Sequence, residues 1–151
     1  MAPKAARTSA GHALEFDPAP SPDVRATLAR EINGFHARTV PHDSTRFAVL
    51  LRGEDGALAA GVMGVMSWKW LFIEAMWVGD HLRGQGLGRT LMSAAEAHAL
   101  KAGCHSAWLD TFQARHFYLA LGYETFGVLD DYPPGQSRTF MKKRLGPEAP
   151  A

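Results

Sequence analysis

A glycine-rich turn at residues 83–88, Arg-Gly-Gln-Gly-Leu-Gly, is the part of this sequence best suited to binding chemistry. Glycines lack a Cβ atom, so the backbone N–H groups of such a turn can converge on one ligand. The helical segment that follows adds unpaired N–H groups and the positive end of its dipole. The turn therefore predicts an anion site that would hold a phosphate or a pyrophosphate.

Glu74 is a carboxylate in the otherwise apolar segment 70–78, just before this turn. A charge in such surroundings costs free energy unless it has a partner or a role. Strand alternation would place Glu74 on one face together with Phe72, Met76 and Val78. Two interpretations stay open: a general base in proton transfer, or the ion-pair partner of a basic residue such as Lys69 or Arg138.

The pattern of residues in the first part of the chain predicts one helix. Ser21 and Pro22 suit an N-cap and a first helical residue, and apolar residues follow at positions 24, 28, 32 and 35. We expect Gly34 to end this helix and a short strand to precede it at residues 13–16. Residues 35–45 are expected to form a loop or a short second helix.

Residues 46–78 predict an antiparallel meander of three strands. Apolar runs at 47–51, 58–67 and 70–78 are separated by the turn signal Glu54-Asp55-Gly56 and by Trp68-Lys69. Connections this short join neighbouring antiparallel strands. The glycine-rich turn thus follows the third strand directly.

A strand–helix–strand unit comes next. Leu91, Ala95, Ala99 and Ala102 form an apolar stripe, which predicts a helix of about 15 residues that ends near Gly103. Residues 106–112 then form a buried strand, parallel to 70–78 through a right-handed crossover. This pairing brings Asp110, a second candidate base, beside the strand of Glu74. A short helix at 114–121 and an antiparallel pair at 123–128 and 138–144 complete the prediction.

Length and composition narrow the class of protein. With 151 residues and a net charge of +1, the chain suits one domain without a dedicated surface for nucleic acid or membranes. A single cysteine and seven histidines without metal-ligand spacing predict a cytoplasmic protein without a metal ion. We expect a disordered tail at 1–11, one domain at 12–145 and a short tail at 146–151.

Three features together resemble the GNAT superfamily of acyl-CoA-dependent N-acyltransferases. Arg83, Gly86 and Gly88 match the family's core motif of Arg or Gln, two residues, Gly, one residue, and Gly or Ala. Met76-Trp77-Val78 precedes the motif, and Phe117-Tyr118-x-x-Leu121-Gly122-Tyr123 follows the next strand. The resemblance covers residues 12–145 and implies an α/β (α+β) fold. In it a mixed, mostly antiparallel sheet of six to seven strands carries helices on both faces, and the family's fourth and fifth strands are parallel and splayed.

The resemblance also implies a binding mode for acetyl-CoA. The turn would hold the pyrophosphate through Arg83, Gln85, Gly86, Leu87, Gly88 and Arg89. The pantetheine arm would pair with main-chain groups of Met76 and Val78, and the Val78 N–H would stabilise the thioester oxyanion. Tyr118 matches the family's acid, which protonates the leaving thiolate, whereas Phe117 would be a core aromatic.

These features favour an N-acetyltransferase whose acceptor is a primary amine of a small molecule, attacking the thioester directly in a ternary complex. Residues 33–45, Trp68, Trp70 and the loop 132–135 would form an aromatic pocket with a few acids, suited to a cation. Glu74 would act through water, and Asp110 or water alone are the other proton acceptors. The alternative functions are a non-catalytic acetyl-CoA-binding regulatory module and an acetyltransferase of a protein or an aminoacyl-tRNA. A homodimer is left open.

Overall fold

The computed structural model of the protein describes residues 6–147 and divides into two compact units, Met1–His42 and Asp43–Ala151. We describe each unit by itself. Residues 1–5 and 148–151, which belong to the two predicted tails, lie outside the described residues.

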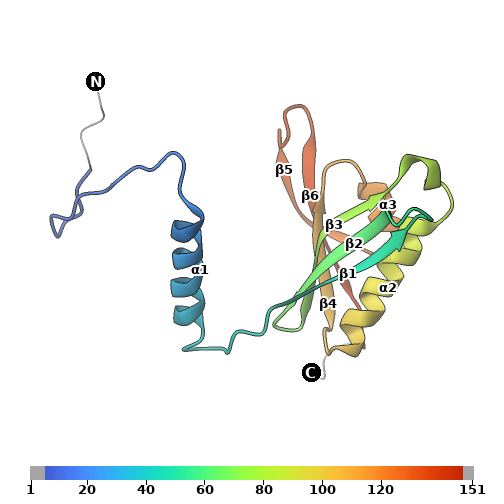
Figure 1. The fold of residues 1–151 in the computed structure, drawn as a ribbon, viewed down its shortest axis with the longest axis horizontal. Helices are drawn as coiled ribbons and strands as arrows, with labels where there is room; N and C mark the ends of the chain where they lie inside the picture. Colours follow the sequence, from blue (N-terminus) through green and yellow to red (C-terminus); the bar gives the residue numbers. More distant parts are fainter. Residues whose placement is uncertain (1–5, 148–151) are drawn as a thin grey trace. The chain divides into compact units, whose positions relative to one another are not determined.

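The first unit contains the α-helix α1 (Pro22–His36), drawn in blue in Figure 1. Ser21 precedes it in an extended conformation and Pro22 takes the first helical turn, as predicted. The predicted helix end is wrong, because Gly34 lies inside the helix. One glycine near a helix end costs only about 1 kcal/mol relative to alanine, so the helix continues through it.

The segments on either side of α1 also differ from the prediction. Residues 13–16 form no strand, and Ala13 makes one isolated antiparallel bridge to Arg7. This bridge closes a turn in which the Gly11 N–H donates to the Thr8 carbonyl (2.9 Å), within the segment expected to be disordered. Residues 37–44 form turns and irregular chain rather than a second helix.

The second unit is built on a six-stranded sheet in the order β1-β2-β3-β4-β6-β5 (Figure 1). The strands are β1 (Thr45–Arg52), β2 (Leu58–Ser67), β3 (Trp70–Val78), β4 (Ser106–Thr111), β5 (Glu124–Asp130) and β6 (Ser137–Arg144). β3 and β4 pair in parallel, and the other neighbours pair antiparallel. The predicted mixed sheet, with its meander, its parallel pair and its last antiparallel pair, is confirmed.

The turn between β2 and β3 consists of Trp68 and Lys69, both with positive φ (48° and 65°). Two-residue hairpin turns of this kind favour glycine and asparagine, because larger side chains are strained at positive φ. Asp43 supports the turn, since its carboxylate accepts a hydrogen bond from the Trp68 N–H (2.7 Å). The turn fixes where β3 begins.

Two helices, α2 (Leu87–Lys101) and α3 (Arg115–Ala120), pack on one face of the sheet. The 15 residues of α2 and its end before Gly103 (φ 97°) agree with the prediction. Gly64 on β2 leaves room for side chains of the two neighbouring strands, because a Cβ there would lie 2.8 Å from side-chain atoms of Leu71 on β3 and Phe47 on β1. α2 buries four side chains in the core: Leu91, Met92, Ala95 and Ala99. Helices on both faces of the sheet remain a prediction.

β3 and β4 pair over a short stretch, from Trp70 with Ser106 to Phe72 with Trp108. Beyond Phe72 the two strands separate. A β-bulge at Glu74 also interrupts the pairing of β3 with β2, where the register shifts between Met63 and Gly64. The predicted splay is therefore present, and it opens a gap between β3 and β4.

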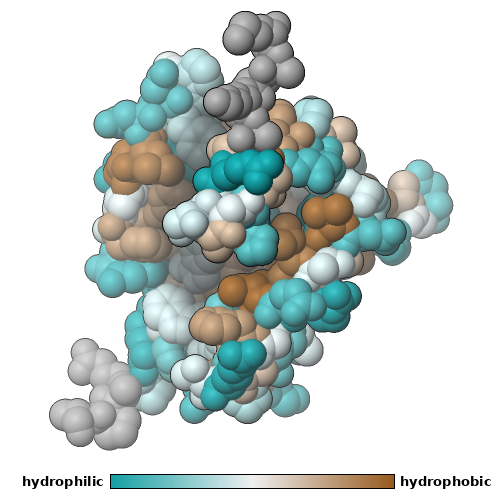
Figure 2. All heavy atoms as spheres, turned by 90° about the vertical axis from the view of Figure 1, so that its left-hand side faces the viewer, coloured by the Kyte–Doolittle hydropathy of each residue, from teal (hydrophilic) through white to brown (hydrophobic). Residues whose placement is uncertain are grey.

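Polar and charged side chains cover most of the face drawn in Figure 2. Apolar side chains gather on that face in separate patches. No helix among residues 6–147 is long and apolar enough to cross a membrane.

Candidate active site

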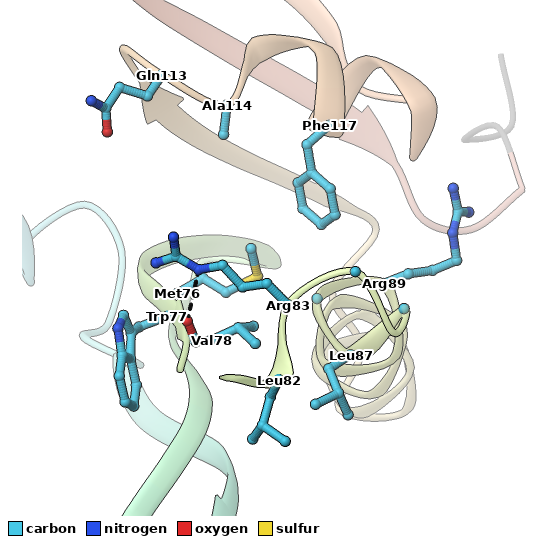
Figure 3. Close-up of a pocket in the computed structure, with 13 residues that line it drawn as sticks. Met76, Trp77, Val78, Leu82, Arg83, Leu87, Arg89, Gln113, Ala114 and Phe117 are labelled. Carbon is cyan, nitrogen blue, oxygen red and sulfur yellow. Dashed lines mark hydrogen bonds between the residues drawn. The ribbon is translucent and has the colours of Figure 1, made fainter. Parts of the chain in front are cut away.

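A cavity of about 660 Å³, which we call the turn cavity, lies between the end of β3, the glycine-rich turn and the start of α3 (Figure 3). It brings together most of the residues predicted to bind the cofactor: Met76, Val78, Arg83, Gly86, Leu87, Gly88 and Arg89. Gln85 is not part of the wall. Its side-chain Nε2 donates instead to the His81 carbonyl (3.4 Å), so we expect its main-chain N–H rather than its side chain to contribute to binding.

The glycine-rich turn presents main-chain donors. Gly84 and Gly86 shape it through positive φ angles of 76° and 78°. The N–H groups of residues 85–89 have no hydrogen-bond partner among residues 6–147, as expected where a helix begins. These donors and the dipole of α2 make this end of the turn cavity suitable for an anion.

The main-chain groups of Met76 and Val78 face the gap between β3 and β4. The Gly79 N–H donates to the Ala59 carbonyl on β2 (2.9 Å). Because main-chain groups alternate in an antiparallel ladder, those of Val78 and Met76 point away from β2. The Val78 carbonyl accepts a hydrogen bond from Nε of Arg83 (3.1 Å, dashed in Figure 3).

A second cavity, of about 350 Å³, opens where β3 and β4 have separated, and we call it the gap cavity. Its polar side chains come from β3, β4, α3 and β6 and the connection before α3: Glu74, Asp110, Thr111, Gln113, Tyr118 and Arg138. Met76, Gln113 and Ala114 line both cavities. The turn cavity and the gap cavity therefore meet at a shared wall.

The bulge at Glu74 makes the alternation predicted for β3 wrong. Phe72 stacks on Trp108 (ring centroids 4.2 Å apart) on the face opposite the core. Met76 and Val78, in contrast, pack against the core. One extra residue reverses the alternation, so the side chains before and after Glu74 change faces.

Glu74 forms an ion pair, one of its two predicted interpretations, but with a partner that the sequence did not predict. Its carboxylate accepts two hydrogen bonds from Arg46 on β1, at 3.0 and 3.1 Å. The predicted partners Lys69 and Arg138 are therefore wrong. Arg46 lies 28 positions from Glu74, and no local pattern relates the two residues.

Asp110 pairs with Arg138 on the wall of the gap cavity. Their side chains are only 24% and 23% exposed. The guanidinium lies over the rings of Tyr132 (4.3 Å) and Phe112 (5.7 Å), and its buried Nε has no hydrogen-bond partner within residues 6–147. The second candidate base thus lies beside a cation held by two aromatic rings.

Tyr118 is 7% exposed and lines the gap cavity. Its hydroxyl has no hydrogen-bond partner in the described part of the chain. Burial raises the pKa of Tyr118, because the phenolate would lose its hydration. Phe117 points instead into the turn cavity (Figure 3), so these two neighbours on α3 face different cavities.

The acetyltransferase (GNAT) family model matches residues 12–123. The chain belongs to this GNAT acetyltransferase family. It is 39% identical to the blasticidin-S acetyltransferase of Streptomyces morookaense over 102 residues, which cover 66% of this chain and 75% of the relative. A crystal structure of an acetyltransferase from Bacillus cereus has a TM-score of 0.77 and 26% identity, and the match covers 86% of this chain and 97% of that one. An aminoglycoside 6'-N-acetyltransferase complexed with coenzyme A shares the fold, with a TM-score of 0.62 and 17% identity over 84% of this chain and 89% of that one.

The sequence predicts that Trp68 and Trp70 of this acyl-CoA-dependent N-acetyltransferase belong to the acceptor pocket. Neither residue lines the turn cavity or the gap cavity, and Trp68 instead lines a smaller cavity with Asp43 and Thr45 of the same predicted pocket. Trp70 lies at the other end of β3, where its ring meets His105 at 5.7 Å. Tyr132 does stand beside the gap cavity, through its contact with Arg138.

Proposed function

We propose that this acetyltransferase moves the acetyl group of acetyl-CoA to a primary amine of a small molecule by direct attack in a ternary complex. The observation that supports it best is the wall of Met76, Gln113 and Ala114 shared by the two cavities. A thioester held from the turn cavity and an amine held in the gap cavity would meet there. The names of the relatives, which include blasticidin-S and aminoglycoside acetyltransferases, support a small-molecule acceptor.

The turn cavity offers the interactions that acetyl-CoA needs. The free N–H groups of residues 85–89 would bind the pyrophosphate, with Arg83 and Arg89 nearby. The main-chain groups of Met76 and Val78 would pair with the pantetheine arm as a neighbouring strand does. Arg83 must then release the Val78 carbonyl, and the Val78 N–H would donate to the thioester oxygen as negative charge develops.

The reaction moves two protons. The amine nitrogen attacks the carbonyl carbon and loses a proton, and the C–S bond breaks to leave a thiolate that needs one. Tyr118 would supply the proton to sulfur, since its raised pKa keeps the phenol protonated at neutral pH. Glu74 would accept the proton of the amine through water. We assign this role to Glu74 rather than Asp110 because the relaying water needs access to the carboxylate. The Glu74 side chain is 35% exposed, and that of Asp110 is 24% exposed.

Tyr118→Phe tests the proposal. It removes the proton donor and keeps the ring, so turnover should fall about 10²- to 10⁴-fold while acetyl-CoA affinity changes little. In the wild type, activity should still hold at the pH of about 10 where an exposed tyrosine ionises, because burial raises the pKa of Tyr118. The fall in activity at higher pH should vanish in the variant. Thiol release is measured over a panel of small amines, peptides and aminoacyl-tRNA.

Two results would contradict the proposal. Turnover of Tyr118→Phe within about threefold of wild type would mean that another group protonates the thiolate. Thiol release with peptides or aminoacyl-tRNA, and with no small amine, would exclude the small-molecule acceptor.

A further inference from the structure

The Tyr118 hydroxyl has no hydrogen-bond partner within residues 6–147, so contacts of its ring and backbone determine its place. Its ring meets Phe117 and Tyr123 edge-on, with centroids 5.0 and 5.8 Å apart. The main chain also joins Tyr118 to Tyr123, whose N–H donates to the Tyr118 carbonyl (3.1 Å). The place of the Tyr118 hydroxyl therefore depends on where Tyr123 is held.

Tyr123 is held by two charged residues from other elements. Its hydroxyl donates to one carboxylate oxygen of Glu96 on α2 (2.9 Å). The Lys143 ammonium on β6 donates to the other oxygen (2.8 Å) and lies 5.5 Å from the centre of the Tyr123 ring. The described walls of the two cavities include none of these three residues.

This network is enclosed. Tyr123 is 2% exposed, and the side chains of Glu96 and Lys143 are 15% and 25% exposed. An enclosed ion pair adds little to stability, because desolvation of the two charges offsets their attraction. Burial, then the Glu96 charge, raises the pKa of Tyr123, so its hydroxyl stays protonated and continues to donate.

We propose that Tyr123, Glu96 and Lys143 are positioning residues that hold the Tyr118 hydroxyl where it protonates the leaving thiolate. The proposal rests on the function proposed for Tyr118. Lys143 keeps Glu96 in place, Glu96 fixes Tyr123, and Tyr123 fixes Tyr118 through the ring contact and the backbone hydrogen bond. A displacement on the order of 1 Å can lower turnover by about 10²-fold, so the loss of one bond in this network should be measurable.

The kinetic test uses the full chain and the small amine of highest turnover in the panel. Tyr123→Phe and Glu96→Gln should each lower kcat by about 5- to 20-fold and leave the acetyl-CoA Kd within about twofold of wild type. Both substitutions are then made again in a Tyr118→Phe background. There they should cause no further loss, because no hydroxyl remains to be positioned.

Lys143→Met and Lys142→Met form a matched pair of variants. Lys142 is the neighbour of Lys143 on β6 and pairs with Glu124 at 3.7 Å, with side chains 46% and 72% exposed. Lys143→Met should reproduce the loss of kcat seen with Glu96→Gln, and Lys142→Met should behave as wild type. Each variant keeps most of its side-chain volume, so we expect it to fold. Thermal melting identifies any variant that does not.

A spectroscopic test does not depend on turnover. The chain has three tyrosines, so labelling with ¹³Cζ-tyrosine gives three NMR signals, of which the Tyr118 signal is assigned by its loss in Tyr118→Phe. Glu96→Gln should shift or broaden this signal, and Lys142→Met should leave it unchanged. This result does not depend on the activity of Tyr118→Phe. If that variant proves active, the function proposed for Tyr118 fails, but the NMR signal still shows whether the network positions the Tyr118 ring.

Two results would overturn the positioning proposal. One is a loss of kcat for Glu96→Gln that persists in full when Tyr118 is already phenylalanine, which would make the network a general support of the fold. The other is a Tyr118 signal that stays at its wild-type position in both Tyr123→Phe and Glu96→Gln.

Discussion

The turn cavity and the gap cavity differ in what builds them. The turn cavity is lined mainly by one continuous segment, from the end of β3 into α2, and its hydrogen-bond donors are largely main-chain N–H groups. The gap cavity is made by side chains from distant strands, with two carboxylates that are each paired to an arginine. A site of main-chain groups tolerates side-chain changes and suits a ligand that stays constant, whereas a site of side chains can change with each acceptor.

The largest effect should come from blocking the turn cavity. Gly86 has φ 78° and a Cβ there would meet no other atom within 4 Å, so the cavity itself has room for a side chain. Gly86→Glu would add a negative charge beside the N–H groups that bind the pyrophosphate, and acetyl-CoA affinity should fall by more than about 100-fold. Titration calorimetry measures this directly.

Gly56→Glu is the control for backbone strain. Gly56 also has a positive φ (80°), but it lies in the β1–β2 turn. A side chain at such an angle costs about 1–2 kcal/mol in either variant, so both should melt at similarly lowered temperatures. Equal loss of acetyl-CoA binding in the two variants would show that strain, and not the anion site, explains the effect.

An intermediate effect is expected in the gap cavity. Glu74→Gln keeps the side-chain shape but removes the proton acceptor, so turnover at neutral pH should fall about 10- to 100-fold and the acidic limb of the pH–rate profile should move. Acetyl-CoA affinity should not change, because Glu74 does not line the turn cavity. If the acidic limb keeps its wild-type position, Glu74 only pairs with Arg46, and Asp110 or water accepts the proton.

The smallest effects should be losses of stability when either gap-cavity carboxylate loses its arginine partner, and the two losses should differ. Arg138→Met leaves Asp110 unpaired where both side chains are about three-quarters covered, so the free energy of unfolding should fall by about 1–3 kcal/mol. Arg46→Met breaks a pair in which the arginine side chain is 61% exposed, and the loss should be about 1 kcal/mol or less. Urea denaturation compares the variants. Equal losses would argue against a structural difference between the two pairs.

Most of the second unit could be predicted from its sequence because its signals are local. Apolar runs, the hairpin signal at residues 54–56 and the stripe of α2 each predict an element from neighbouring residues, and the structure places these elements within a residue or two of the prediction. The anion site is equally local, since the glycines and the helix start lie within a few positions.

The gap cavity could not be predicted in the same way. The partners of Glu74 and Asp110 each lie 28 positions away, and their pairing depends on the assembled sheet. The bulge at Glu74 is invisible to a rule that assumes strict alternation, so one extra residue made the predicted faces of Met76 and Val78 wrong. The sequence predicts Trp68 and Trp70 in the acceptor pocket from their residue type, which carries no information about their distance from the gap cavity.

The bulge also determines which changes of length this strand can accept. Glu74 is the residue by which β3 exceeds its partner β2. Deleting Glu74 would join Ile73 to Ala75 and restore strict alternation, with Ile73, Met76 and Val78 still on the core side and Trp77 still exposed. Such a deletion would remove the ion pair with Arg46, but it would leave the end of the strand in its present orientation. Loss of one residue between Ala75 and Val78 would instead turn part of the strand end to the opposite face. Evolution of this segment is therefore expected to accept a change of length at the bulge more readily than one between Ala75 and the glycine-rich turn.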